Sequence, residues 1–177
     1  SQVEELHLKG KEYKDIAKGW TKYPFFIDDS GKIMSMLPYI NSHTMGKIDE
    51  STTEIFIECT GTDLHNVQTA LNIFVSMFAD MGADIYSVEV AYAPKMMTTP
   101  DLAPKKMKLD LAYINQRLGL ELREKEAGVL LEKMGHGYEK GMVLIPAYRG
   151  DILHQVDLME DIAIAYGYEN FDAIIPN

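Results

Sequence analysis

The chain of 177 residues has a single cysteine, Cys59, and lacks any apolar run long enough to cross a lipid bilayer. One cysteine cannot form an internal disulfide, which favours a reducing compartment. A membrane-spanning helix needs about 20 consecutive apolar residues. The polar opening SQVEELHLKGKEYKD does not have the pattern of a signal peptide. We therefore expect a cytoplasmic protein with no membrane partner.

Basic residues are also scarce. The net charge is −10, and Lys47 is the only Lys or Arg between Ile33 and Tyr92. A protein that binds nucleic acid through phosphate contacts shows a basic stripe instead. The sequence also lacks the glycine-rich fingerprints of phosphate-binding loops and dinucleotide sites. By itself, this chain is expected to bind RNA or DNA weakly.

Apolar residues make up 46% of the chain and charged residues 25%, which suits one large globular domain or two small ones. The clearest boundary is the segment 93–105, with three prolines in APKMMTTPDLAPK. Prolines at this density disfavour helix and interrupt strand pairing. The sequence predicts a linker or extended crossover at 93–105 between regions 1–92 and 106–177.

The first region mixes strand and helix patterns. The ranges predicted as strands, from alternating apolar residues and flanking turn residues, are 23–28, 32–36, 54–59 and 85–92. A helix is predicted from Thr62 or Asp63 to about Asp80. Its expected apolar face consists of Leu64, Val67, Leu71, Phe74, Val75 and Phe78. This mixture predicts an α+β fold.

The second region has a different pattern. Short strands are predicted at 107–109 and 142–145, and helices at 111–118, 121–135 and 155–166. Three helices with a small sheet in about 70 residues suit a winged-helix-like domain.

Four acidic residues gather near the start of the last predicted helix: Asp151, Asp157, Glu160 and Asp161. If this helix begins near Gln155, the last three stand at i, i+3 and i+4 and share one face. Converging carboxylates repel one another unless a cation or a basic partner lies between them. Oxygen ligands favour Mg²⁺ or Ca²⁺ over zinc. The alternative is that these acids only stabilise the positive end of the helix dipole.

A second candidate site lies in the segments IMSMLPYINS and TTEIFIECTGTD. Two strand ends meeting there would bring together the hydroxyl, amide and carboxylate groups of Ser35, Asn41, Glu58 and Thr60. The alternative is that Glu58 lies on a solvated strand face, since carboxylates are seldom buried without a partner.

The segment PAYRGDILHQVDLMEDIAIAYGY resembles the end of a small domain in the beta subunit of phenylalanine–tRNA ligase. In that family a YR-x-D-I strand end leads into D-x-x-E-[DE]-x-A-x-x-Y-G-Y. The resemblance implies that Asp151, Asp157, Glu160 and Asp161 hold Mg²⁺ at the border with the alpha subunit.

The second pair of segments resembles the editing module of the archaeal and eukaryotic beta subunits. That module has a proline-containing strand end closing in I-N and a second strand end reading F-I-[DE]-x-T-G-T-D. Here Leu37 and Tyr39 replace a proline and an isoleucine of the family pattern. The resemblance implies hydrolysis of tyrosine wrongly attached to tRNA(Phe), with Ser35, Asn41, Glu58 and Thr60 in the pocket.

We therefore expect part of an editing-module sheet with a packed helix at 1–92, and a winged-helix-like domain carrying the acidic segment at 106–177. The resemblance implies a tetramer of two alpha and two beta subunits, with tRNA(Phe) as substrate and ATP used by the alpha subunit. A start at Ser1 without Met suggests an excised fragment. One alternative is a free-standing hydrolase of mischarged tRNA. The other, a winged-helix nucleic-acid-binding protein, is disfavoured because Arg117 is the only basic residue of the helix 111–118.

Overall fold

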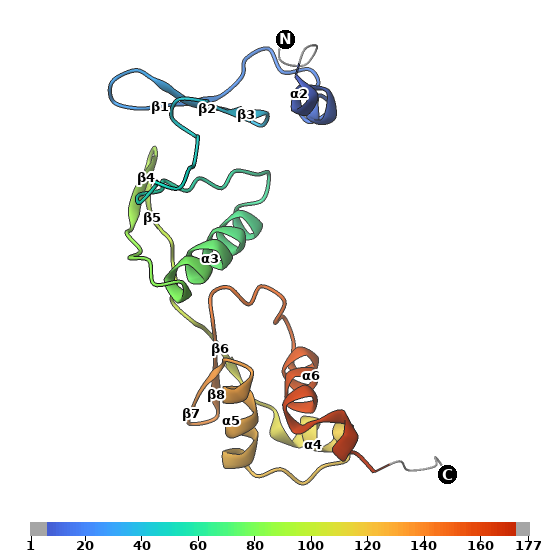
Figure 1. The fold of residues 1–177 in the computed structure, drawn as a ribbon. Coiled ribbons are helices and arrows are strands. Elements are labelled where there is room, and N and C mark those ends of the chain that lie inside the picture. The colour runs from blue at the N-terminus through green and yellow to red at the C-terminus, as the bar shows by residue number, and fades with distance from the viewer. Residues whose placement is uncertain (1–6, 173–177) are drawn as a thin grey trace. The chain divides into compact units, whose positions relative to one another are not determined.

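A computed structural model describes residues 7–172 of the chain (Figure 1). Its contacts define two compact units that divide between Thr60 and Gly61. The outermost parts of the predicted regions, 1–6 and 173–177, lie outside the described residues. Within residues 7–172, no helix combines the length and the apolar character that crossing a membrane requires.

The first unit contains a short helix and a small antiparallel sheet. Helix α2 spans Leu8–Tyr13, and the sheet has the order β1-β2-β3, with β1 at Phe25–Ile27, β2 at Ile33–Met36 and β3 at Ile40–Asn41. The Asp28 carboxylate closes the turn between β1 and β2, accepting hydrogen bonds from the Lys32 backbone N–H at 2.7 Å and from the Ser30 hydroxyl. The predicted pair of strands around this turn is confirmed.

The strand predicted at 54–59 is wrong, because the structure gives these residues no regular secondary structure. A strand is stabilised by hydrogen bonds to a neighbour, and the described part of the chain supplies no ladder for this segment. The side chains of Ile55 and Phe56 are 48% and 55% exposed. Their alternating apolar pattern therefore has no sheet to join within residues 7–172.

The second unit begins with helix α3, Leu64–Asp80. The Asp63 carboxylate caps it by accepting a hydrogen bond from the Asn66 N–H at 2.8 Å, as the sequence predicts. The predicted apolar face is only partly right. Val75 is buried beside the polar Asn72, whereas Leu64 and Phe74 are about half exposed.

The proline-rich segment differs from the prediction. Lys95–Thr99 forms strand β5, which pairs antiparallel with β4, Val88–Tyr92, across a turn at Ala93 and Pro94. Lys105, at the end of the segment, already begins strand β6. The prolines flank β5 and leave it free to pair, so the segment is a hairpin arm and a crossover, and the two compact units do not divide here.

The remainder of the second unit is close to the predicted winged-helix-like domain. The sheet has the order β6-β8-β7 and is antiparallel, with β6 at Lys105–Lys108, β7 at Gly137–Glu139 and β8 at Met142–Ile145. The helices are α4 at Leu111–Leu118, α5 at Glu124–Lys133, α6 at Gln155–Tyr166 and the 3₁₀ turn η1 at Tyr168–Asn170. Gly119 ends α4 with a left-handed φ of 68°, as predicted for a glycine at this position.

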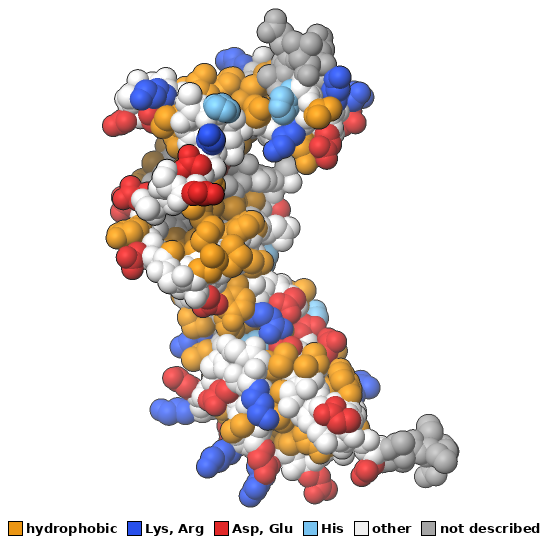
Figure 2. All heavy atoms as spheres, in the orientation of Figure 1, with side chains coloured by type: hydrophobic (Ala, Val, Ile, Leu, Met, Phe, Trp, Pro, Cys, Tyr) orange, Lys and Arg blue, Asp and Glu red, His pale blue; other side chains and the backbone are white. Residues whose placement is uncertain are grey.

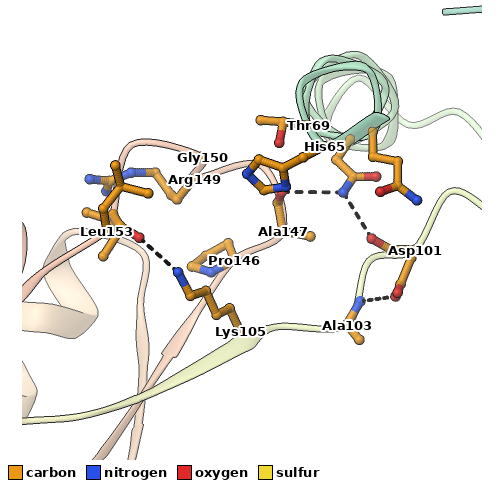
Figure 3. A pocket seen from close by; sticks show the side chains of 13 residues that line it. His65, Thr69, Asp101, Ala103, Lys105, Pro146, Ala147, Arg149, Gly150 and Leu153 are labelled. Atoms are coloured by element: carbon orange, nitrogen blue, oxygen red, sulfur yellow. Dashed lines mark hydrogen bonds between the residues drawn. The ribbon is translucent and has the colours of Figure 1, made fainter. Parts of the chain in front are cut away.

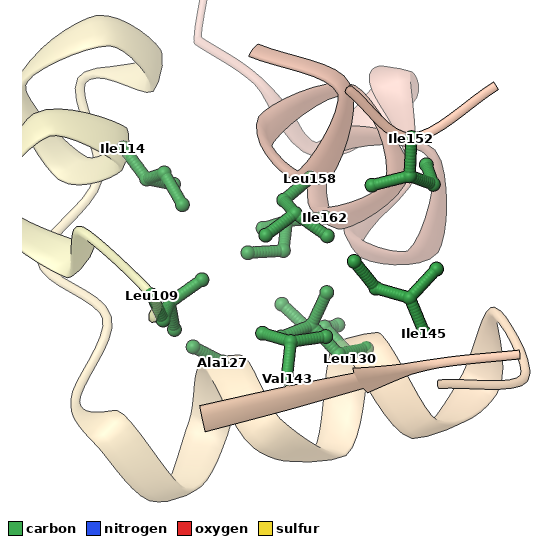
Figure 4. Close-up of a cluster of buried hydrophobic side chains, with 10 residues drawn as sticks. Leu109, Ile114, Ala127, Leu130, Val143, Ile145, Ile152, Leu158 and Ile162 are labelled. Atoms are coloured by element: carbon green, nitrogen blue, oxygen red, sulfur yellow. The ribbon is translucent and has the colours of Figure 1, made fainter. Parts of the chain in front are cut away.

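These elements enclose one apolar core (Figure 4). Its buried members are Leu109, Ile114, Ala127, Leu130, Leu131, Val143, Ile145, Ile152, Leu158 and Ile162. Burying one large aliphatic side chain contributes about 1.5–3 kcal/mol relative to leaving it exposed. This core fixes α6 against α5 and the sheet, and so fixes the position of the acidic segment.

Candidate functional site

The acidic segment is built around the start of α6. The Asp157 carboxylate turns back over the first turn, where its Oδ2 accepts hydrogen bonds from the backbone N–H groups of Leu153 and His154, both at 2.7 Å. These two bonds hold the pKa of Asp157 below its usual value. In the free chain Asp157 therefore has the role of a helix-capping acid.

Asp161 lies one turn further along α6 and faces the interior, with only 5% of its surface exposed. Its Oδ2 lies 2.6 Å from Nε2 of the buried His136. Arg149 contacts the same carboxylate, with its Nη2 donating to Oδ2 at 2.9 Å and to Oδ1 at 3.2 Å. The sequence did not identify His136, which lies 25 residues before Asp161 and joins it only through the packing of α6.

Arg149 also forms a fork with Asp151. Its Nη2 donates to Asp151 Oδ2 at 2.7 Å and its Nε donates to Oδ1 at 2.9 Å. The guanidinium lowers the pKa of Asp151, and the Asp151 carboxylate in turn raises the pKa of Arg149. Arg149 lies in the YR-x-D motif, where the sequence predicts a role for Asp151 but not for the arginine.

The fourth acid, Glu160, is exposed on α6. Among residues 7–172 no group of three or more His, Cys, Asp or Glu side chains is arranged to hold a metal ion. Oδ2 of Asp157 is already occupied by two backbone N–H groups, and both oxygens of Asp161 are occupied by Arg149 and His136. The four predicted ligands therefore do not fit a metal ion by themselves in this arrangement.

The second candidate site lies in the first unit. The Ser35 hydroxyl, on the buried side of β2, donates to Glu58 Oε1 at 3.1 Å across 23 residues of sequence. Asn41 lies opposite Ser35 in the pairing of β2 with β3. The structure thus brings three of the four predicted residues to one end of the sheet. Thr60 is exposed at the end of the unit.

Glu58 is in an unusual environment for a carboxylate. Its Oε2 is buried and has no hydrogen-bond partner among the described residues. Burial raises the pKa of the Glu58 carboxyl, and the hydrogen bond from Ser35 opposes that shift. Tyr39, which departs from the family pattern, is 2% exposed, and its ring centroid lies 6.1 Å from that of Tyr23. Its bulk is therefore part of the buried packing of the first unit.

A cavity of about 190 Å³ in the second unit was not anticipated from the sequence (Figure 3). The Asn72 side chain of α3 donates from Nδ2 to the carbonyl oxygens of Asp101 and Ala147 at 2.9 and 3.3 Å. Lys105 donates from Nζ to the Ile152 carbonyl at 3.3 Å. The Asn72 amide nitrogen thus ties α3 to the loop that carries Arg149, whereas its Oδ1 is buried and has no hydrogen-bond partner among the described residues.

Comparison with known proteins gives consistent results. Residues 107–168 match the family model of the tRNA synthetase B5 domain. The phenylalanine–tRNA ligase beta subunit of Thermococcus sibiricus is 42% identical over 175 residues, covering 97% of this chain and 31% of that protein. The corresponding subunit of Archaeoglobus fulgidus is 41% identical over 180 residues, covering 99% of this chain and 32% of that protein.

The fold agrees as well. The crystal structure of an N-terminal fragment of the phenylalanyl-tRNA synthetase beta subunit from Pyrococcus horikoshii has a TM-score of 0.85 and 39% identity, covering 94% of this chain and 49% of that one. The α+β fold class is thereby confirmed, and residues 107–168 form a B5 domain of the kind found in tRNA synthetases. The chain belongs to the phenylalanine–tRNA ligase beta subunit family, as the sequence resemblance indicated. It spans about a third of the length of the curated relatives it matches.

Proposed function

We propose that the chain forms part of the beta subunit of a cytoplasmic phenylalanine–tRNA ligase, which takes part in charging tRNA(Phe) with phenylalanine. The observation that carries this proposal is the match of nearly the whole chain, in sequence and in fold, to archaeal beta subunits. In this proposal ATP is used by the alpha subunit, and the complete enzyme is a tetramer of two alpha and two beta subunits.

The first unit is proposed to contribute to an editing pocket. Tyrosine differs from phenylalanine by one hydroxyl, and an apolar pocket that binds phenylalanine excludes this extra group poorly. A second pocket that accepts a hydrogen bond from the phenol would select tyrosine instead. Glu58 is the proposed acceptor, held by Ser35 at 3.1 Å, with Asn41 and Thr60 completing the polar set. A positioned water is the proposed nucleophile.

The editing proposal is tested by measuring release of tyrosine from tyrosyl-tRNA(Phe). The chain is assayed alone and in complex with the alpha subunit, beside Glu58→Ala and Asn41→Ala variants. Glu54→Ala is the matched control, because Glu54 is an exposed acid of the same segment. We expect Glu58→Ala to lose the preference for tyrosine over phenylalanine and the control to keep it. Unchanged discrimination in Glu58→Ala would rule out the proposed role.

The alpha subunit is the proposed protein partner of the acidic segment. Because the four acids do not fit a metal ion by themselves, the magnesium implied for Asp151, Asp157, Glu160 and Asp161 would need further ligands from outside this chain. Glu160 is exposed and free to face such a partner. Reversing its charge, Glu160→Lys, should weaken association with the alpha subunit in analytical ultracentrifugation. Glu132→Lys, at an exposed acid of α5, is the control. If Glu160→Lys associates with the alpha subunit as tightly as Glu132→Lys does, the exposed face of α6 that carries Glu160 is not part of the interface.

Exposed apolar side chains support the proposal that this chain works within a larger assembly. Near the C-terminal end of α3 the exposed apolar residues are Ile73, Phe74 and Met77, and the exposed Met81 follows directly after the helix (Figure 2). Contiguous apolar surface of this kind marks a contact with another protein segment.

A further inference from the structure

Arg149 lies between the exposed carboxylate of Asp151 and the buried carboxylate of Asp161. It donates to Asp151 at 2.7 and 2.9 Å and to Asp161 at 2.9 and 3.2 Å, so one guanidinium serves two acids. The Arg149 side chain is 19% exposed and that of Asp161 only 7%. Both charges are thus largely withdrawn from water.

The Arg149 guanidinium thus offsets the negative charge of the Asp151 and Asp161 carboxylates, which is the role that the sequence predicts for a divalent cation. A guanidinium presents a planar fork of donors that matches carboxylate oxygens in pairs. A buried carboxylate must be paired, because an uncompensated charge in the interior is costly. His136 adds a contact at 2.6 Å to Oδ2 of Asp161, the same oxygen that Arg149 contacts at 2.9 Å. The oxygens that a metal ion would use at Asp161 are therefore already engaged.

We infer that Arg149 takes the place of the divalent cation in the free chain, and that Arg149 and a divalent ion exclude each other at Asp151 and Asp161. A metal ion at these oxygens would lie within a few ångströms of the guanidinium, where like charges repel strongly in a partly buried setting. Mg²⁺ also demands near-ideal octahedral geometry and gives up its water reluctantly. Binding of the ion therefore requires Arg149 to leave, for example toward an acid of a partner protein. This inference does not depend on the proposed function, because it concerns this chain alone.

The test is titration of the full chain with MgCl₂ by isothermal calorimetry, repeated with Tb³⁺ luminescence and Mg²⁺ competition. Arg149→Gln removes the charge, and Arg149→Lys keeps it without the fork. Arg123→Gln is the matched control, since Arg123 pairs with Glu126 at 2.7 Å on the surface of the same domain. We expect Arg149→Gln to bind Mg²⁺ at least about tenfold more tightly than the unaltered chain, since it removes a nearby positive charge. The control should not differ from the unaltered chain.

Two results would overturn the inference: micromolar Mg²⁺ binding by the unaltered chain, or equal affinities of the chain and Arg149→Gln. Should Arg149→Gln fail to fold by circular dichroism, the unaltered chain still decides the question. Its Arg149 Nε–Hε resonance, identified by its loss in Arg149→Lys, is followed by NMR during the Mg²⁺ titration. We expect this resonance to move as the ion binds. Saturation with Mg²⁺ while the resonance stays in place would show that ion and guanidinium coexist.

Discussion

Nε2 of His136 lies 2.6 Å from Oδ2 of Asp161 in the interior of the B5 domain, and Arg149 contacts the same carboxylate at 2.9 Å. Replacing Asp161 with alanine would leave His136 and Arg149 without their shared partner. Breaking a buried pair in this way typically costs about 3–5 kcal/mol. We expect Asp161→Ala to reduce the free energy of unfolding by an amount of this order in urea denaturation.

Asp151→Ala provides the comparison for that experiment. Asp151 contacts the same guanidinium, but its side chain is 62% exposed. An exposed ion pair contributes only about 0–1 kcal/mol, because water screens it and compensates its loss. A loss at Asp151→Ala as large as that at Asp161→Ala would show that burial does not set the strength of this network.

Asp157 should contribute to the stability of α6 through its two backbone hydrogen bonds. Loss of a comparable capping side chain costs about 0.5–2 kcal/mol. Asp157→Ala should therefore lower the melting temperature by several degrees, whereas alanine at the exposed Glu160 of the same helix should change it little. Because the folded state lowers the pKa of Asp157, this stabilisation is present above the unfolded pKa and disappears as the pH falls through the folded pKa. The two melting temperatures of Asp157→Ala and the unaltered chain should converge in acid.

Glu58 should have the opposite pH dependence. Burial raises its pKa above the usual 4.5, so as the pH rises the unfolded chain loses this proton before the folded chain does. The first unit then loses stability as the pH rises from 4.5 through the folded pKa. Glu58→Gln cannot ionise and should escape that loss, which makes the variant relatively more stable at neutral than at acidic pH.

The fluorescence of Trp20, the single tryptophan, reports unfolding of the first unit for this measurement. Glutamine at the exposed Glu54 should leave the pH profile unchanged. If the stability of the first unit changes with pH in the same way in Glu58→Gln and in the unaltered chain, Glu58 is not buried as described.

Gly128 should resist substitution although it lies in a helix. Alanine is usually the better helix former by about 1 kcal/mol, but a Cβ at Gly128 would meet the Tyr138 ring at 2.7 Å. The Tyr138 hydroxyl donates to Glu124 at 2.9 Å, which holds the ring in place. We expect Gly128→Ala to destabilise the domain by about 1–3 kcal/mol, as overpacking of a core does.

The same change tested in a Tyr138→Ala background separates the two effects. Without the ring, Gly128→Ala should become neutral or stabilising in thermal unfolding. If Gly128→Ala destabilises the domain equally with and without the Tyr138 ring, contact with that ring is not the cause of the destabilisation.

Local patterns in the sequence determined helices α3, α4 and α6 and most of their ends, whereas α2 was not predicted and α5 is shorter than the predicted 121–135. Asp63 and Asp110 cap α3 and α4, and Gly119 and Gly167 end α4 and α6, because caps and left-handed glycines act over a few neighbouring residues. The family was likewise readable from the sequence, since both motifs are short and contiguous. The assignment of Ser35, Asn41, Glu58 and Thr60 to editing, and of the four acids to magnesium, remains a prediction.

Only the tertiary structure decided the partners of these residues. Whether 54–59 forms a strand depends on a neighbouring strand, and whether 95–99 pairs depends on β4 across the turn at Pro94. Helical spacing placed Asp157 and Asp161 on one face, yet it could not show that the first caps the helix while the second is buried against His136 and Arg149. Hydrogen bonds and burial join residues far apart in the chain, so the charge balance of the acidic segment is a property of the packed core.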